Sequence, residues 1–193
     1  MILMRIMNLT EDSKLYTSNV YFILGEWNTL DDVNTLIDVG SDIKVIDKLQ
    51  AMNTGLGKRK VDQVIITHSH SDHVSLLPSI IEAFNPKIYG FNIHLKGVNH
   101  ALHDGDKLRI GEKMFEVIHI TSHSYDSICL YCEEDGILFS GDTNFPIEFE
   151  NQQLKDENAY AISRLHGKVI KQIYSGHGAV QDFNSRKFEL TKQ

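Results

Sequence analysis

Histidine and aspartate are concentrated in one short stretch of this sequence. Residues 66–77 read ITHSHSDHVSLL, so three histidines and an aspartate fall within six positions, directly after an apolar run. Imidazole and carboxylate groups together are the ligands that zinc, iron and manganese take in proteins. In an extended loop, residues two apart face the same way, so the H-x-H pair suits a single metal ion. The stretch therefore predicts a metal site rather than a solvated polar loop.

The same kinds of side chain recur along the chain, each at the end of an apolar segment. Loops at strand ends are where a rigid scaffold presents functional groups, so we expect these residues to converge. Five histidines exceed the needs of one catalytic metal ion, which commonly has three protein ligands and an open position. The set therefore favours two metal ions that share an aspartate. The candidates are Asp38, His68, His70, Asp72, His73, His123, Asp142 and His177.

Three other residues of metal-binding type have more than one interpretation. His119 lies four residues before His123, and it fits either a place behind the metal ligands or a place in the core. Cys129 and Cys132 have the C-x-x-C spacing of redox pairs and of half zinc sites. They lie in SICLYCEE, which reads as a strand, and residues three apart on a strand point to opposite faces. We expect both cysteines to be structural.

The elements that must position these residues follow from hydrophobic periodicity. A helix over 41–52 is expected to open on a Ser/Asp cap and to bury Ile43, Ile46, Leu49 and Met52. Strands dominate both halves of the chain with helices between them, which predicts an αβ layered domain with mixed sheets. The other expected helices are 75–84 and 158–167, and the expected strands are 20–25, 34–40, 61–67, 86–91, two within 103–121, a hairpin over 127–142, and 168–178.

Composition sets the class of protein. The chain has 193 residues and a net charge of −7, with 41% hydrophobic residues. No linker-like segment divides it, so we expect a single domain over 1–193. The acidic balance argues against a nucleic-acid or anionic-membrane partner. Without an apolar run of membrane-spanning length or a signal peptide, a cytoplasmic protein with a small-molecule substrate is expected. The sequence does not indicate an oligomeric state.

The sequence resembles the metallo-β-lactamase-fold hydrolase superfamily, and within it the glyoxalase II-like branch most closely. The resemblance extends over nearly the whole chain and rests on five segments. These are TLIDVGSD with Asp38, THSHSDH with the complete H-x-H-x-D-H motif, IHITSHSYDS with His123, GILFSGDTNF with Asp142, and IYSGHG with His177.

The resemblance implies a fold and a role for each candidate residue. The fold would be α+β, a four-layer αββα sandwich of two mixed β-sheets flanked by helices, with the metal ions at one sheet edge. Asp38 would be a buried residue that orients ligands, and Asp72 would also be catalytic, orienting the nucleophile or carrying a proton. One metal ion would be bound by His68, His70 and His123 and the other by Asp72, His73 and His177, with Asp142 bridging.

The end of the chain departs from the family pattern. Glyoxalase II has a C-terminal helical region that helps to hold glutathione, whereas only 16 residues follow His177 here. The expectation is therefore a glyoxalase II-like catalytic domain without the glutathione-binding region.

The expected activity is hydrolysis of an ester, thioester or lactone. Two metal ions, expected to be zinc with iron or manganese as alternatives, would convert water to a hydroxide that attacks the carbonyl. A serine mechanism is not expected, because the chain has no G-x-S-x-G motif. Two alternatives stay open at this point, which are a mononuclear iron oxidoreductase like the persulfide dioxygenases of this superfamily and a two-metal phosphodiesterase.

Overall fold

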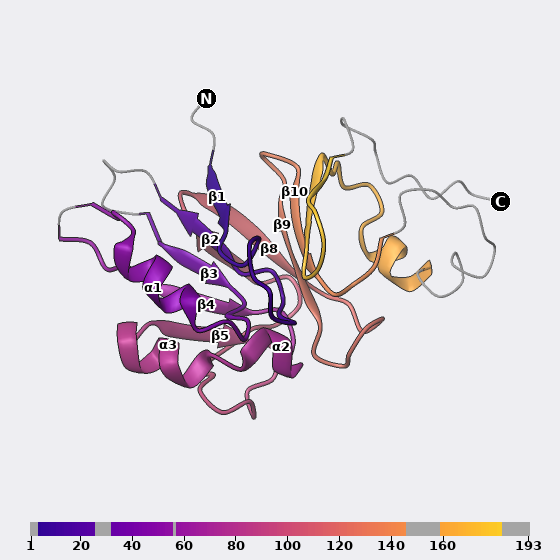
Figure 1. Ribbon diagram of the computed structural model, residues 1–193. Coiled ribbons are helices and arrows are strands. Elements are labelled where there is room, and N and C mark those ends of the chain that lie inside the picture. The colour runs from indigo at the N-terminus through magenta and orange to yellow at the C-terminus, as the bar shows by residue number, and fades with distance from the viewer. Residues whose placement is uncertain (1–3, 26–31, 56, 146–158, 183–193) are drawn as a thin grey trace.

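Two six-stranded β-sheets form the centre of the molecule (Figure 1). The computed structural model describes residues 4–25, 32–55, 57–145 and 159–182. The first sheet is mixed, because β1–β3 pair antiparallel and β3–β6 pair parallel. Its strands follow one another in space as in sequence, and they are β1 (Arg5–Asn8), β2 (Tyr21–Leu24), β3 (Thr35–Ile37), β4 (Gln63–Ile66), β5 (Lys87–Gly90) and β6 (His100–Ala101).

The second sheet is built from the other half of the chain. It is antiparallel except for the parallel pair β10 and β11, whose register shifts between Phe139 and Gly141. Such a bulge bends a strand and redirects the side chains that follow it. Here the residue that follows the strand is Asp142. The strands are β7 (Lys107–Ile110), β8 (Lys113–His119), β9 (Ile128–Cys132), β10 (Ile137–Gly141), β11 (Gln172–Ser175) and β12 (Gln181–Asp182).

Helices cover the outer faces of both sheets. Helices α1 (Lys44–Ala51) and α3 (Leu77–Phe84) pack on the outer face of the first sheet, and α2 (Ser71–Val74) is a single turn before α3 (Figure 1). The helical segment 159–164 packs on the outer face of the second sheet through Ala161. None of the helices in the described part of the chain has the length and apolar character needed to span a bilayer. The predicted αββα arrangement is confirmed.

Side-chain alternation divides the core into layers. On β2, Tyr21 and Ile23 face the second sheet, whereas Phe22 and Leu24 face the helices. Successive strand residues point to opposite faces, so one strand contributes side chains to two core layers. The same alternation places Cys129 in the outer layer and Cys132 between the sheets, with both thiols buried. Burial raises the pKa of Cys129 to about 12 and also raises that of Cys132.

Helix α1 corrects one detail of the sequence prediction. It begins three residues later than expected, and Asp42 Oδ1 accepts the backbone N–H of Lys44 at 3.1 Å. The residues that it buries are Val45 and Leu49; Ile46 and Met52 are half-buried against the same core, and Ile43 is 57% exposed. Ile43 precedes the first helical turn, so the helical spacing that included it did not apply to its side chain.

The remaining elements follow the prediction with shifted boundaries. The structure contains the hairpin over 127–142, the two strands within 103–121 and the strands predicted near 20–25, 34–40, 61–67, 86–91 and 168–178. Residues 26–31, between the first two of these strands, and residue 158 of the predicted helix lie outside the described residues. The strands β1, β6 and β12 and the helix α2 were not predicted. Each has four residues or fewer, and none has the run of buried apolar residues that marks β4.

Candidate metal centre

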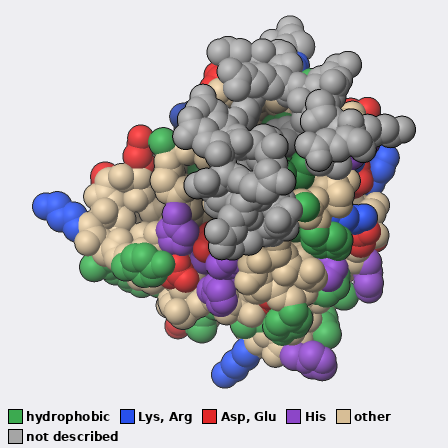
Figure 2. Space-filling model, turned by 90° about the vertical axis from the view of Figure 1, so that its right-hand side faces the viewer, with side chains coloured by type: hydrophobic (Ala, Val, Ile, Leu, Met, Phe, Trp, Pro, Cys, Tyr) green, Lys and Arg blue, Asp and Glu red, His purple; other side chains and the backbone are tan. Residues whose placement is uncertain are grey.

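The side chains singled out in the sequence meet at one edge of the sandwich. His68 and His70 follow β4, and His123 lies in the loop between β8 and β9. Asp142 follows β10, and His177 follows β11. In Figure 2, histidine and acidic side chains lie together near the middle of this face. These five predicted ligands therefore lie beyond the ends of strands, and the strands belong to both sheets.

Asp72 and His73 occupy a helical turn rather than the loop that the sequence predicted. Helix α2 (Ser71–Val74) is a separate turn, and the predicted helix 75–84 corresponds to α3, which begins at Leu77. Backbone bonds fix this turn, since His73 O accepts the N–H groups of Val39 and Gly40 and Asp72 O accepts that of Ser18. These bonds connect the turn to the loops around β2 and β3.

Three imidazoles converge at one end of the site. His70 Nδ1 lies 3.0 Å from His68 Nε2 and 3.0 Å from His123 Nε2. Nitrogen ligands of a tetrahedral zinc ion, each about 2.05 Å from it, lie about 3.3 Å from one another. The spacing of these nitrogen atoms is close to that value. His68, His70 and His123 therefore form a first triad suited to a metal ion, and their ligand atoms, with one from Asp142, lie within 4.8 Å of one another.

A second triad lies beside the first. Asp72 Oδ2 is 3.0 Å from His177 Nε2 and 3.9 Å from His73 Nε2. The ligand atoms of these three residues again lie within 4.8 Å of one another. One carboxylate and two imidazoles are a donor set that zinc, iron and manganese all accept.

Asp142 lies between the triads. Its Oδ2 is 3.5 Å from His123 Nε2 and 3.5 Å from His177 Nε2, and its Oδ1 is 3.1 Å from His73 Nε2. A single carboxylate is thus within reach of ligands from both groups, which is the position that a bridging ligand needs. Metal binding by all seven residues stays a prediction, and the geometry agrees with it.

Two buried atoms at the centre fit a bound cation. Among the described residues, His73 Nε2 and Asp142 Oδ1 have no well-directed hydrogen bond, although they face each other at 3.1 Å. Buried polar atoms without partners are costly, and a metal ion would coordinate both of these atoms. The donor types and the lack of other partners therefore fit a metal centre.

The pKa values of the site show the influence of these close contacts. Burial, helped by the charge of His73, lowers the pKa of His68 to about 4, so this ring keeps a free lone pair. Burial also opposes protonation of His73, but the carboxylates of Asp38 and Asp142 outweigh it and raise its pKa to about 10. Burial disfavours ionised Asp142, yet the contact with His73 lowers its pKa to about 2. Without metal, a proton on His73 places a positive charge beside Asp142, where a bound metal ion would otherwise place one.

Asp38 fixes the orientation of one histidine in each triad. Its Oδ2 accepts the Nδ1–H of His73 at 2.7 Å and the hydroxyl of Thr67 at 2.8 Å. Thr67 Oγ1 lies 3.1 Å from His68 Nδ1, and since its only proton goes to Asp38, it accepts the His68 Nδ1–H. Both rings then direct Nε2 into the site. Asp38 itself is buried and has φ +58, an uncommon conformation for an aspartate.

Two residues of this site were missed from the sequence. Thr67 directly precedes the first histidine, and a hydroxyl residue in that place was the available signal. Gly176 directly precedes His177, and a Cβ atom there would lie 2.1 Å from Asp142 Oδ1 and 2.8 Å from His73 Cε1. Only glycine lets the backbone approach this closely. The glycine beside a candidate ligand was visible in the sequence, but the close contact was not.

A family comparison agrees with the fold. The profile of the Metallo-beta-lactamase superfamily matches residues 14–166, and the chain belongs to this superfamily. It is 35% identical over 83 residues to a hydroxyacylglutathione hydrolase (glyoxalase II) of Marinomonas sp. (strain MWYL1), a match covering 42% of this chain and 32% of that protein. The glyoxalase II-like resemblance is thereby supported.

Two further comparisons extend over more of the chain. Atrochrysone carboxyl ACP thioesterase dmxR1 of Cryptosporiopsis sp. (strain 8999) is 25% identical over 187 residues, covering 86% of this chain and 57% of that protein. The crystal structure of the BLEG-1 B3 metallo-beta-lactamase aligns with a TM-score of 0.64 at 20% identity, covering 93% of this chain and 94% of that one. The chain thus spans about a third of the first relative and just over half of the second.

Proposed function

We propose that this chain is a hydrolase that uses two metal ions, most simply zinc, to cleave an ester, thioester or lactone of a small molecule. The observation that carries the proposal is the position of Asp142 between two complete triads. A single metal ion would need only one triad. Asp72, His73 and His177 would then be assembled without a metal ion to bind. The printed names of the two curated relatives, a hydroxyacylglutathione hydrolase and a thioesterase, support an acyl substrate.

Bound metal ions would supply a water of lowered pKa and would polarise the substrate carbonyl. His68, His70 and His123 would hold one ion, Asp72, His73 and His177 the other, and Asp142 both. Asp38 keeps a proton on Nδ1 of His73 and, through Thr67, on Nδ1 of His68, so that neither ring turns away. Donation of the second ring nitrogen to a carboxylate also makes the ligand nitrogen more basic.

Asp72 is the residue best placed to move a proton. Its Oδ2 pairs with His177, which leaves Oδ1 to accept a proton from the attacking water and to return it to the leaving group. Asp72 would then both bind a metal ion and act in catalysis. The substrate is expected to be uncharged or weakly charged, because the net charge of −7 repels polyanions.

The test is a substrate panel with metal analysis. Protein loaded with zinc should hydrolyse chromogenic thioesters or lactones, and His68→Ala should lower kcat/KM by at least about a hundredfold. His94→Ala, a change at a histidine outside both triads, is the matched control and should keep the activity.

Other outcomes of the same panel would overturn the proposal. Activity on phosphodiesters alone would favour the two-metal phosphodiesterase. A single iron ion per chain with oxygen uptake would favour the dioxygenase-like alternative. Unchanged hydrolysis in His68→Ala would show that the site is not catalytic.

A further inference from the structure

Each triad is assembled from both sheets. In the first, His68 and His70 follow β4 of the first sheet, but His123 comes from the β8–β9 loop of the second. In the second, Asp72 and His73 follow β4, but His177 comes from the end of β11. The distances within each triad therefore depend on contacts that connect the two sheets at this edge.

His119 makes such a contact beside the first triad. It is the last residue of β8 and follows Phe115 and Val117 on the face that meets the first sheet. Its ring stacks on Phe91, just beyond β5 of the first sheet, with centroids 3.8 Å apart and planes 11° apart. The sequence left His119 either in the core or behind the metal ligands. The ring packs against a residue of the inter-sheet core, and it also makes a polar bond near His123.

That polar bond holds the loop that carries His123. His119 Nε2 donates to the backbone carbonyl of Tyr125 at 2.8 Å, two residues after His123. The Tyr125 hydroxyl in turn accepts a hydrogen bond from Asn92 Nδ2, which lies next to Phe91. His119, with Phe91 and Asn92, therefore ties the His123 loop to the first sheet.

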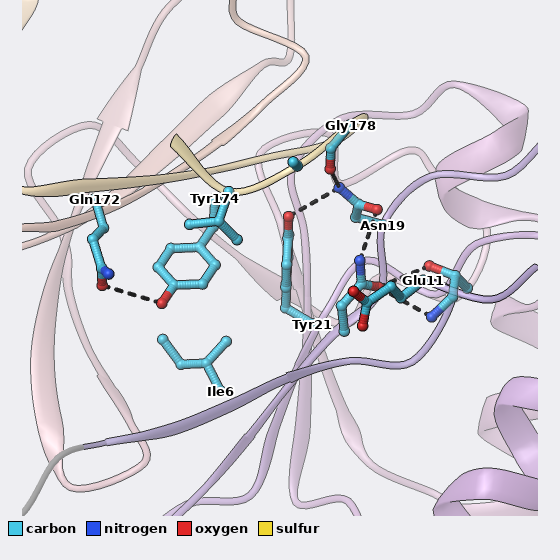
Figure 3. Close-up of a pocket in the computed structure, with 11 residues that line it drawn as sticks. Ile6, Glu11, Asn19, Tyr21, Gln172, Tyr174 and Gly178 are labelled. Atoms are coloured by element: carbon cyan, nitrogen blue, oxygen red, sulfur yellow. Dashed lines mark hydrogen bonds between the residues drawn. The ribbon is translucent and has the colours of Figure 1, made fainter. Parts of the chain in front are cut away.

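Asn19 makes the corresponding contact beside the second triad. It lies just before β2 of the first sheet, and its backbone N–H donates to Gly176 O at 2.6 Å. Its Nδ2 donates to Gly178 O at 2.9 Å (Figure 3) and to Ser175 O at 2.9 Å, so the side chain spans the loop that carries His177.

The surroundings keep the Asn19 side chain in place. Asn19 Oδ1 accepts a hydrogen bond from Asn8 Nδ2 at 2.9 Å, which fixes the direction of the amide. Tyr21 OH lies 2.9 Å from Asn19 Nδ2 and donates to Ser175 O at 2.8 Å. These residues line a cavity of about 770 Å³ on the side of the His177 loop where β1, β2 and β11 meet (Figure 3).

We propose that His119 and Asn19 are positioning residues, each serving one triad, His119 through the His123 loop and Asn19 through the His177 loop. The two metal affinities can then be altered separately. The inference rests on the proposed metal binding but not on the identity of the substrate.

The test measures zinc affinity in two backgrounds of the full chain. The His177→Ala variant leaves the first triad intact, and His123→Ala leaves the second. In the first background, His119→Phe should weaken zinc binding about tenfold, whereas Asn19→Ala should leave it unchanged. In the second background, Asn19→Ala should weaken zinc binding about tenfold, and His119→Phe should leave it unchanged.

Two variants separate positioning from simple loss of packing. His119→Phe keeps an aromatic ring against Phe91 and removes only the donor. His119→Gln keeps an N–H donor without the ring, so it should restore most of the lost affinity. Circular dichroism of the metal-free variants checks that each is folded.

The pattern of losses decides the outcome. Equal losses in both backgrounds, or no rescue by His119→Gln, would overturn the inference. If neither background protein bound zinc while the original chain bound two ions, the separate roles would also be refuted. Failure of the original chain to bind zinc would instead refute the proposed function.

Discussion

At the scale of single residues, the site depends on a few groups that belong to neither triad. Asp38 accepts hydrogen bonds from His73 and Thr67, and the Thr67 hydroxyl in turn accepts the Nδ1–H of His68. One carboxylate thus orients ligands of both triads. The candidate metal ligands can be recognised in the sequence by their residue types, whereas the residues that orient them are of common types.

Thr67→Val tests this constraint on His68. Valine has nearly the shape of threonine but no hydroxyl, so Asp38 Oδ2 loses a donor and His68 Nδ1 loses its acceptor. We expect the zinc affinity of the first triad to fall about 10–100-fold, measured by competition with a chromogenic chelator. Thr67→Ser keeps the hydroxyl and should bind nearly as the original chain does; an equal loss in both variants would contradict the role of the hydroxyl.

Gly176→Ala tests the close approach of the His177 loop to Asp142. The added Cβ would lie 2.1 Å from Asp142 Oδ1, so the carboxylate or the loop must move. We expect the variant to bind less than two zinc ions per chain by elemental analysis while it still folds. Gly105→Ala is the control for strain away from the site: nothing lies within 4 Å of its new Cβ, but its φ of +84 strains the backbone, so it should cost stability and still bind two zinc ions. Retention of both ions in Gly176→Ala would show that Asp142 need not stay where it is.

At the scale of elements, segments with a clear apolar pattern were predictable, whereas short, mostly exposed ones were not. Strands β4 and β9 contain runs of buried residues, and helix α3 has apolar residues at helical spacing. Helix α2 has four residues, and its position depends on the bonds from Val39 and Gly40 to His73 O, which join segments far apart in sequence. Ile43, which was wrongly assigned to the buried face of α1, lies just before the helix start, where helical periodicity does not apply.

Two substitutions, one in α1 and one just before it, test whether Leu49 contributes to the core and Ile43 does not. Leu49 is fully buried, so Leu49→Ala should lower the free energy of unfolding by about 2–5 kcal/mol. Ile43 is 57% exposed, so Ile43→Ala should change it by no more than about 0.5 kcal/mol. Urea unfolding of both variants decides the matter, and similar losses would mean that Ile43 contributes to the core after all.

At the scale of the whole molecule, the two sheets meet along one core and present one functional edge. The gathering of His and Asp side chains at that edge could be predicted from their residue types and their places after apolar segments. The contacts that assemble it could not, since Asn19 and Gly176 are more than 150 residues apart and meet only in the folded chain. Asn19 carries no signal until the sheets are placed together, and the spacing of His119 to His123 left its place open between two interpretations.

Metal removal should therefore affect the stability of the whole fold. Metal ions that bind across both sheets stabilise the folded state, by about 2.7 kcal/mol per site at a free metal concentration one hundred times Kd. For a chain of this size that corresponds to about 5–10 °C in Tm per site. Chelation should lower Tm by this order in scanning calorimetry. The double variant His68→Ala/His177→Ala should show no such shift; an equal shift in it would place the metal elsewhere.

The most direct measurement is a crystal structure of the zinc-loaded chain with anomalous scattering collected at the zinc edge. The account predicts two anomalous peaks at the sheet edge. One should be bound by His68, His70 and His123 and the other by Asp72, His73 and His177, with the Asp142 carboxylate between them. A single peak, or zinc bound away from these side chains, would contradict the two-metal centre.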